Sequence, residues 1–384
     1  MIIAFNLIPY TEVNGLQIFA ANLLEHLQIG PEDRLLLFTN QKSSELFKDL
    51  NPRAEMINKN FPRLSRFQLA LYQQLSFNQA LKKEKVDVLF CPSLALPLFW
   101  RKKIVTIHDL AFLRYREESS GGIFRLYLKL ALWSAKYFSL GLAAISEFSR
   151  QEIVDLMRVP KEKIAIISRG APEFPEISET EEIEVLNKFQ LLSANRQPKK
   201  YWLYLGAGYY RKNLDRLLEA FRLFLVDNGD EAEKYYLVIA GKQDEGIRKI
   251  ASLVKEDGAW SQFSSQIIFT GFITENEKQA LIKNALALAF VSLYEGFGLP
   301  PLEAQALNTP VLGGNSSSIP EICGQGAYLV DPKNIPAIKE SLSLISSDDK
   351  LRQELISRGQ KNLEHYSWTQ VAQDFNSLIH RYDH

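Results

Sequence analysis

Two glutamates that are separated by seven residues are the first groups in this chain that could do chemistry. Glu295 and Glu303 flank a short stretch rich in glycine and proline, so that the whole segment reads EGFGLPPLE. A carboxylate accepts two hydrogen bonds at once, which suits the paired hydroxyls of a ribose or a hexose. It would repel a phosphate that lay directly against it. We therefore expect both glutamates to face sugar hydroxyls.

Arg211 and Lys212 form a second candidate group, in the loop GAGYYRKN that follows an expected strand. We expect them to begin a helix that continues over 214–224. Cations at a helix N-terminus oppose the helix dipole, so these two residues are unfavourable for stability unless an anionic ligand binds there. The pair therefore predicts a site for a ligand that carries phosphate.

The elements around the glutamates place both groups at one edge of a sheet. The continuous apolar run 285–291 predicts a strand that is buried on both faces of a parallel sheet. Gly296 and Gly298 allow backbone angles that other residues resist, and Pro300 and Pro301 suit the first turn of a helix. Free N–H groups at such a helix start attract anions, and ligands of open α/β sheets bind at the carboxyl ends of the strands. A phosphate, a ribose and a second sugar are the parts of a nucleotide-sugar, which is therefore the ligand predicted at this edge of the sheet.

The same strand-then-helix pattern recurs along both halves of the chain, which predicts an α/β protein. A long helical region is expected between the second and third strands. An acidic, proline-containing stretch after Pro172, through Glu184, is the expected interdomain linker. The other expected strands are 2–7, 34–39, 86–91, 103–109, 142–145, 164–167, 201–205, 236–240, 267–270 and 309–312.

Composition sets the broad class. A chain of 384 residues, 46% hydrophobic and 23% charged, is long for one domain, so two domains are expected. The formal net charge is zero, which argues against a dedicated nucleic-acid binder. Cys91 and Cys323 are far apart and lack partners at ligand spacing, so we expect buried thiols and no metal site. No leader or membrane span is visible, and we expect a cytoplasmic protein.

The N-terminal half is locally basic. From Lys59 to Lys136 the chain has 14 basic and 5 acidic residues, about nine net positive charges. Within this region the segment 123–138, IFRLYLKLALWSAKYF, is an amphipathic helix with basic residues among large apolar ones. It is either a core helix with a solvated stripe or a helix that also contacts an anionic membrane at its inner face. Both interpretations stay open at the level of sequence.

The glutamate pair, taken with its strand, glycine loop and helix, resembles the E-x7-E motif of the retaining family four (group 1) glycosyltransferases. This resemblance covers nearly the whole chain and implies the GT-B fold, in which two Rossmann-like domains with parallel sheets face a central cleft. The expected N-terminal acceptor-binding domain is 1–172, with a C-terminal helix, 366–384, that crosses back onto it. The expected nucleotide-sugar-binding domain is 185–365.

The resemblance also implies roles for individual side chains. Glu303 corresponds to the glutamate that holds the ribose, and Glu295 to the one that approaches the transferred sugar. Arg211 and Lys212 match the family's diphosphate-binding cations, which would stabilise charge growing on the leaving phosphate. His108, in the phrase IHDLAFLRYRE, matches a histidine that reaches the donor sugar.

Further donor contacts are implied through the backbone. The glycine turn at Phe297, Gly298 and Leu299 would contact the sugar and phosphates, and groups around Ile273 would read the nucleobase. Many relatives have a glycine pair where this chain has Asn14-Gly15, so only Gly15 is carried over as a donor contact.

The resemblance implies a retaining hexosyl transfer in which the leaving phosphate itself takes the acceptor's proton. No D-x-D triplet occurs, so we expect neither a metal nor a cofactor. UDP-glucose is favoured over GDP-mannose as the donor, and the expected acceptor is a saccharide or lipid-linked saccharide of a surface or envelope polysaccharide. The alternatives are a sugar-nucleotide 2-epimerase of the same fold, a nucleic-acid-binding protein and a non-catalytic nucleotide-sugar binder.

Overall fold

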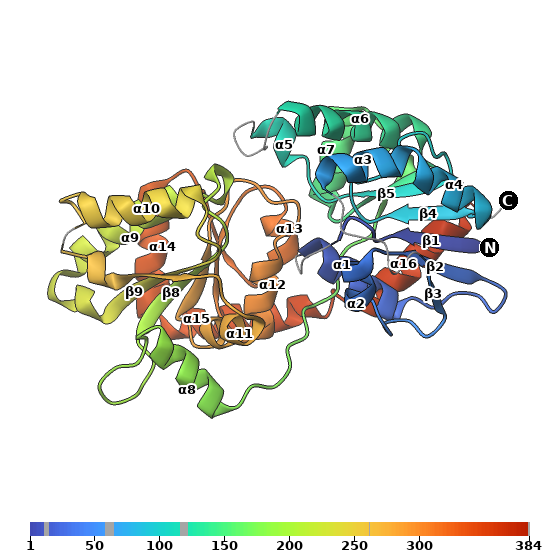
Figure 1. Cartoon of the computed structure of the whole chain (residues 1–384). Coiled ribbons are helices and arrows are strands. Elements are labelled where there is room, and N and C mark those ends of the chain that lie inside the picture. Colours follow the sequence, from blue (N-terminus) through green and yellow to red (C-terminus); the bar gives the residue numbers. More distant parts are fainter. Residues whose placement is uncertain (11–14, 58–64, 116–121, 261, 383–384) are drawn as a thin grey trace. The chain divides into compact units, whose positions relative to one another are not determined.

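The structure, a computed structural model, describes residues 1–10, 15–57, 65–115, 122–260 and 262–382. It divides into two compact units, of which the first is Met1–Gly170 with Tyr366–His384 and the second is Ala171–His365 (Figure 1). The stretch expected as a linker therefore belongs to the second unit. In the described part of the chain, no helix is long and apolar enough to cross a membrane.

The first unit is built on a parallel sheet, seven-stranded within the described residues, in the order β3-β2-β1-β4-β5-β6-β7. Most positions in its central strands are fully buried, as expected for a sheet covered on both faces. The strands are β1 (Ile2–Asn6), β2 (Arg34–Phe38), β3 (Ala54–Ile57), β4 (Val88–Cys91), β5 (Lys103–Ile107), β6 (Gly141–Ala144) and β7 (Ile164–Ile166).

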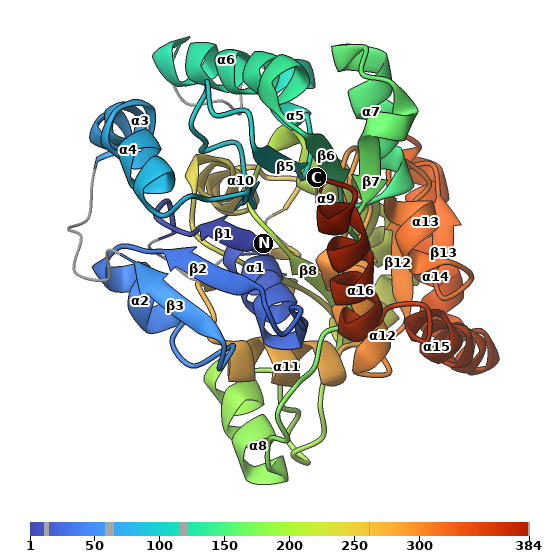
Figure 2. The same cartoon turned by 90° about the vertical axis from the view of Figure 1, so that its right-hand side faces the viewer.

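Helices cover both faces of this sheet (Figure 2). One face carries α3 (Arg66–Gln74), α4 (Ser76–Lys83), α5 (Ala111–Arg114), α6 (Gly122–Phe138) and α7 (Glu147–Met157). The other face carries α1 (Gly15–His26), α2 (Gln41–Leu46) and α16 (Trp368–His380). The helix α16 follows the whole second unit in sequence, yet Trp368, Phe375 and Ile379 lie in the same core as β1.

The second unit repeats the plan with a parallel sheet, six-stranded within the described residues, in the order β10-β9-β8-β11-β12-β13. Its strands are β8 (Lys200–Leu205), β9 (Tyr235–Ala240), β10 (Ile267–Gly271), β11 (Ala287–Phe290), β12 (Val311–Gly314) and β13 (Tyr328–Val330).

Two helical layers cover this second sheet. One contains α9 (Leu214–Asn228), α10 (Glu245–Glu256) and α14 (Ile335–Ser347). The other contains α8 (Glu179–Lys188), α11 (Glu275–Lys283), α12 (Leu299–Ala306) and α13 (Ile319–Cys323), with α15 (Asp349–Leu363) beside α12. Cys91 and Cys323 are buried and free, as expected.

Two strands, β3 and β13, were not predicted from the sequence. The first lies inside the region that was expected to be a long helical one. Both are short edge strands of three or four residues that are only partly buried, so neither has the continuous apolar run that marks a central parallel strand.

Each sheet has one point where the chain reverses the direction in which it adds strands. In the first unit β1 has β2 on one side and β4 on the other, and in the second unit β8 lies between β9 and β11. Loops that leave the carboxyl ends of two such strands diverge and leave a crevice, where ligands of open α/β sheets bind. In the second unit these are the loops after β8 and β11, which carry the predicted cations and Glu295.

Candidate functional site

Arg211 and Lys212 lie in a turn of 3₁₀ helix, Tyr210–Lys212, and not in α9 as the sequence predicted. Asn213 separates the turn from α9 because it adopts a left-handed backbone conformation with φ of 61°, which asparagine tolerates better than most residues. Its side-chain amide donates to the carbonyls of Val291 and Pro332, at 2.9 and 2.6 Å. The turn is thereby tied to the loop after β11.

Two glycine pairs hold the preceding loop against the loop after β9 and the first turn of α10. A Cβ on Gly241 would lie 2.1 Å from the carbonyl oxygen of Gly206, and a Cβ on Gly246 would lie 1.9 Å from that of Gly208. No other residue fits at such close backbone approaches. Asp244 adds a hydrogen bond of 2.8 Å from the Gly208 N–H. This packing fixes where the chain enters the turn with the two cations.

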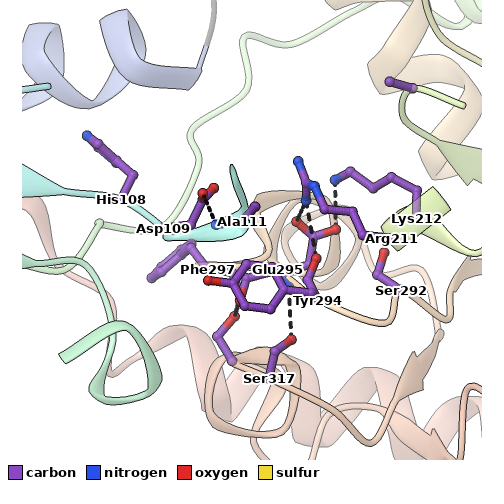
Figure 3. Close-up of polar contacts among 12 residues, drawn as sticks. His108, Asp109, Ala111, Arg211, Lys212, Ser292, Tyr294, Glu295, Phe297 and Ser317 are labelled. Carbon is purple, nitrogen blue, oxygen red and sulfur yellow. Dashed lines mark hydrogen bonds and ion pairs between the residues drawn. The ribbon is translucent and has the colours of Figure 1, made fainter. Parts of the chain in front are cut away.

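Glu295 lies between the two cations (Figure 3). Its Oε1 accepts from Lys212 Nζ at 2.7 Å, and its Oε2 accepts from Arg211 Nη1 at 3.2 Å. Arg211 also donates to the carbonyl of Tyr294 at 3.2 Å. The side chain of Glu295 is only 9% exposed and those of its two partners are 15% exposed.

The charge of Glu295 depends on these partners. Burial alone raises the pKa of the Glu295 carboxyl, but the positive charges of Lys212 and Arg211 outweigh it, so the pKa lies below its usual value. The carboxylate thus takes the place that an anionic ligand would have between the cations. A diphosphate that bound there would compete with Glu295 and leave its oxygens for other hydrogen-bond donors.

Three serines after β12 support the loop that carries Glu295. Ser317 Oγ accepts from the Glu295 N–H at 2.9 Å (Figure 3). Ser318 Oγ donates to the carbonyls of Glu295 and Phe297, at 2.9 and 2.5 Å, and Ser316 Oγ donates to that of Ser292 at 2.7 Å. This role could not be predicted from the sequence, because a run of serines after a strand is typical of any turn.

The second glutamate lies on the helix that starts directly after the glycine turn. Gly298, with φ of 117°, precedes α12, and prolines occupy its first turn, as the sequence predicted. Glu303 is buried, with a side chain 6% exposed, and its Oε1 accepts from Lys278 Nζ of α11 at 2.7 Å. The N–H groups at the start of α12 and the two glutamates therefore belong to one loop-and-helix segment.

Ile273 lies just after β10, between that strand and α11. It is partly buried against the apolar core on the α11 side of the second sheet. Its neighbour Phe272 is 80% exposed. Thr274 then caps α11. The position at the carboxyl end of a strand suits the predicted backbone contact with a nucleobase, which stays a prediction.

His108 follows β5 in the first unit, and its ring is fixed by neighbours of that unit. Its Nε2 lies 2.8 Å from the carbonyl oxygen of Pro92, and Phe19 packs edge-on to it, with ring centroids 5.4 Å apart. Asp109 is the next residue in the chain. Its Oδ1 accepts from the Ala111 N–H at 3.0 Å, so it orients the loop at the start of α5.

These contacts determine what His108 can do. A carbonyl only accepts, so Nε2 carries the proton, and Nδ1, which is buried without a partner, offers a lone pair. Burial, with a smaller effect of Arg169, lowers the pKa of His108 to about 3. His108 is thus a neutral hydrogen-bond acceptor, which suits a sugar hydroxyl. It lines a pocket of about 340 Å³ with Thr106, Tyr127 and several apolar residues.

Gly15 is the first residue of α1, and its carbonyl accepts from Arg169 Nη1 at 2.9 Å. Asn14, where relatives have the first glycine, lies outside the described residues.

The predicted residues thus form two groups, one in each unit. Glu295, Arg211 and Lys212 are in contact, while His108 and Gly15 belong to the first unit. Across the described ranges, no group of three or more His, Cys, Asp or Glu side chains could hold a metal ion, and metal independence stays a prediction.

Comparison with known families decides the identity. The sequence model described as "Glycosyltransferase Family 4" matches residues 13–172, and the one described as "Glycosyl transferases group 1" matches residues 189–362. The chain belongs to the group 1 glycosyltransferases. The expected family membership is confirmed, and with it enzymatic activity.

Relatives of this glycosyltransferase include the O-antigen chain mannosyltransferase B of Escherichia coli, 27% identical over 293 residues, which are 75% of this chain and 73% of the relative. The serotype-specific mannosyltransferase WbdA of Escherichia coli is 30% identical over 60% of this chain but only 27% of its own length. The crystal structure of Anabaena Alr3699/HepE in complex with UDP-glucose matches with a TM-score of 0.72, at 14% identity, over 99% of both chains. Such structural neighbours confirm the expected GT-B fold.

Proposed function

We propose that this glycosyltransferase transfers a hexose from a nucleotide-diphosphate sugar, with retention of configuration and without a metal. The arrangement of Arg211, Lys212 and Glu295 at the reversal point of the second sheet carries this proposal. It offers two partly buried cations for a diphosphate and a carboxylate for the sugar next to it. Glu303, on the adjoining helix, offers a second carboxylate for the ribose.

In the proposed reaction the bond between the sugar C1 and the phosphate oxygen breaks, and a bond from C1 to the acceptor oxygen forms on the same face. The acceptor proton goes to the departing phosphate, so the products are a glycoside and a nucleoside diphosphate. Arg211 and Lys212 stabilise the charge on the leaving diphosphate. His108 and Glu295 position the hexose, His108 by accepting a hydrogen bond from a hydroxyl.

We further propose mannose as the transferred sugar, and a saccharide or lipid-linked saccharide of a surface polysaccharide as the acceptor. The sequence motifs are compatible with both UDP-glucose and GDP-mannose, and UDP-glucose was favoured there only as the commoner donor. The relatives named above, whose sequences are more similar to this chain than that of the UDP-glucose-bound neighbour, are mannosyltransferases of O-antigen or serotype-specific chains. That relation supports a mannosyl donor such as GDP-mannose.

The test is nucleotide release from a panel of GDP-, UDP- and ADP-hexoses by the purified protein in EDTA. We expect slow hydrolysis of one donor, and about 10²- to 10³-fold less in Lys212→Ala. Lys234→Ala is the matched control, because Lys234 is an exposed cation of the same unit that pairs with Glu231. Unchanged turnover in Lys212→Ala, or release only with added metal, would contradict the proposal. Conversion of the sugar without release would indicate the epimerase.

A second proposal concerns α6, whose exposed face is apolar. Ile123, Leu126, Leu130, Trp133 and Tyr137 recur every three or four residues and are 44 to 85% exposed. We call these five residues the α6 stripe. The buried residues of α6 are Ala131, Leu132, Ser134 and Ala135. A core helix with a solvated stripe would instead bury its large apolar residues and expose its polar ones.

Cations accompany the α6 stripe. Arg125, Lys129 and Lys136 lie on the same helix, and Lys136 Nζ lies 5.0 Å from the ring centroid of Tyr137. Phe99, 62% exposed, packs against Trp133. An apolar face with tryptophan and tyrosine beside lysine and arginine suits the interface of an anionic membrane. We propose that α6 binds such a membrane peripherally.

Co-sedimentation with vesicles tests this contact. We expect binding to vesicles containing phosphatidylglycerol, weaker binding to pure phosphatidylcholine, and loss of binding in Leu130→Glu with Trp133→Glu. Val226→Glu, a change at an apolar residue of the second unit that is 49% exposed, is the control. Equal binding by the double variant, or self-association through α6 in sedimentation velocity without vesicles, would contradict the proposal.

A further inference from the structure

Lys278 joins the helix after the predicted base-binding loop to the helix that carries Glu303. It lies in the first turn of α11, three residues after Glu275, and its Nζ is 2.6 Å from Glu275 Oε2 and 2.7 Å from Glu303 Oε1. Its side chain is 17% exposed and that of Glu303 is 6% exposed. The ion pair between α11 and α12 is therefore largely shielded from solvent.

The start of α11 is fixed independently of this pair. Thr274 accepts from the Glu277 N–H, and Glu277 accepts in turn from the Thr274 N–H at 2.7 Å, which forms a capping box. The Lys278 side chain also lies near Phe174, with Nζ 5.9 Å from the ring centroid. The backbone of Lys278 is therefore held near β10 by contacts that do not involve Glu303.

Glu303 needs a cation to act as a carboxylate where it lies. An ionised carboxylate that is buried without a partner tends to take up a proton, and a protonated carboxyl accepts hydrogen bonds more weakly. Burial alone lowers the pKa of Lys278, but Glu303 and Glu275 raise it above its usual value, so Lys278 stays charged. The pair thus places a positive charge 2.7 Å from Glu303 Oε1 and holds that oxygen in a fixed direction.

From this contact we infer that Lys278 is a positioning residue that makes the donor site selective for ribose. The inference rests on the proposed function, in which Glu303 binds the ribose hydroxyls. In this inference Lys278 holds the Glu303 carboxylate so that it accepts from the 2′- and 3′-hydroxyls together. A nucleotide without the 2′-hydroxyl leaves one of these acceptor positions unfilled, and it therefore binds more weakly. No motif in the sequence marks Lys278, because it appears there as an ordinary solvated cation of a capped helix.

The experiment compares GDP with 2′-deoxy-GDP, or the corresponding pair for the nucleotide that the donor panel selects, by calorimetric binding. We expect the wild-type protein to prefer the ribonucleotide by about 10- to 100-fold. In Lys278→Met, which keeps the length of the side chain without its charge, the preference should fall to less than about 3-fold. Lys278→Arg should restore part of it. In turnover, the donor KM should rise in Lys278→Met with a much smaller change in kcat.

The matched control is Lys283→Met. Lys283 lies on the same helix and pairs with Glu182, away from Glu303, so the ribose preference should be unchanged. Circular dichroism and melting of all variants separate a loss of preference from a loss of fold.

The outcomes distinguish two failures. If the wild type prefers the ribonucleotide and Lys278→Met prefers it equally, the inference is wrong and the proposed function stands. If the wild type binds neither nucleotide, the proposed function is wrong, and the inference with it. Glu303→Gln provides the internal reference, since it should lose the preference whether or not Lys278 is present.

Discussion

At the scale of single residues, Glu295 is held by the same two cations that the proposed donor needs. Replacement by Gln removes the negative charge that competes with a diphosphate and leaves Arg211 and Lys212 without its compensation. We expect Glu295→Gln to bind the free nucleoside diphosphate about 10-fold more tightly, or about 1.4 kcal/mol. We also expect about 10²-fold lower turnover, because the sugar loses its carboxylate partner. Calorimetry measures the affinity for the nucleoside diphosphate, and the release assay measures turnover.

The prediction is specific because affinity for the nucleoside diphosphate should rise while turnover falls. A variant that was merely less well folded would lose affinity and turnover together. Glu303→Gln is the reference, because we expect it to weaken nucleotide binding. Weaker binding of the nucleoside diphosphate to Glu295→Gln would show that Glu295 supports the diphosphate site and does not compete for it.

His108 leads to a prediction about pH. Its pKa in the folded protein is about 3, whereas an unfolded histidine has a pKa of about 6.5. Between these values the unfolded chain binds a proton that the folded protein does not, so the free energy of unfolding falls as the pH falls. From pH 7.5 to 5.5 the loss from this residue should be about 1.4 kcal/mol. His108→Gln should lose that part of the pH dependence in urea unfolding.

His365→Gln in the second unit is the control for the pH measurement, since it leaves His108 and its surroundings unchanged. An acid dependence in His108→Gln as steep as that of the wild type would mean that the pKa of His108 is the same in the folded and the unfolded protein. Below about pH 6.5 the ring would then donate from both nitrogens, and its proposed role as an acceptor would be wrong there.

At the scale of elements, the glycine pairs tightly constrain how the loop after β8 packs against the loop after β9 and the start of α10. A Cβ on Gly246 would overlap the Gly208 carbonyl, which belongs to backbone and cannot move aside cheaply. We expect Gly246→Ala to destabilise the second unit by about 1–3 kcal/mol. It should also weaken nucleotide binding, because the turn with Arg211 and Lys212 shifts. Gly258→Ala, where a Cβ meets nothing within 4 Å, is the control.

Thermal melting with and without nucleotide measures both effects. If Gly246→Ala melts lower but gains the wild-type stabilisation from nucleotide, the glycine contact supports the fold and not the site.

The elements also show how far the sequence alone could go. Central strands, the helix after the glycine turn and the two glutamates follow from local patterns: a continuous apolar run, glycines at a turn and prolines in a first turn. The strand Ala54–Ile57 could not be predicted in this way, because an edge strand is half solvated and carries no distinctive periodicity. The turn Tyr210–Lys212 was assigned to α9, because the sequence does not reveal the left-handed conformation of Asn213.

The side chains that support the two glutamates were harder to predict from the sequence than the strands and turns. Lys278 and Ser317 act through contacts with residues 25 and 22 positions away. Nothing in their immediate neighbourhood distinguishes them from a solvated cation and a turn serine. Such contacts depend on which loops the sheet order brings together, and strand order is a property of tertiary packing.

At the scale of the whole molecule, α16 completes the core of the first unit. Phe375 is fully buried, with its ring centroid 4.5 Å from that of Phe90 and 5.6 Å from that of Phe5. We expect Phe375→Ala to destabilise the first unit by about 3–5 kcal/mol, and Ser377→Ala, an exposed position of the same helix, to have little effect. In Phe375→Ala, amide hydrogen exchange should be faster in β1 and β4 than in the wild type and unchanged in the second unit. Equal effects in both units would contradict this assignment of α16.

The return of α16 also determines the order in which the units can be finished on a ribosome. The chain emerges from its N-terminus, but the first unit lacks one of its covering helices until residues 368–380 have been synthesised. The second unit, Ala171–His365, is complete before that helix appears. We therefore expect the unit that comes second in sequence to be the first to reach its native state during translation. Until then the nascent first unit exposes the apolar surface around Phe5 and Phe90, which makes it the natural substrate of a chaperone.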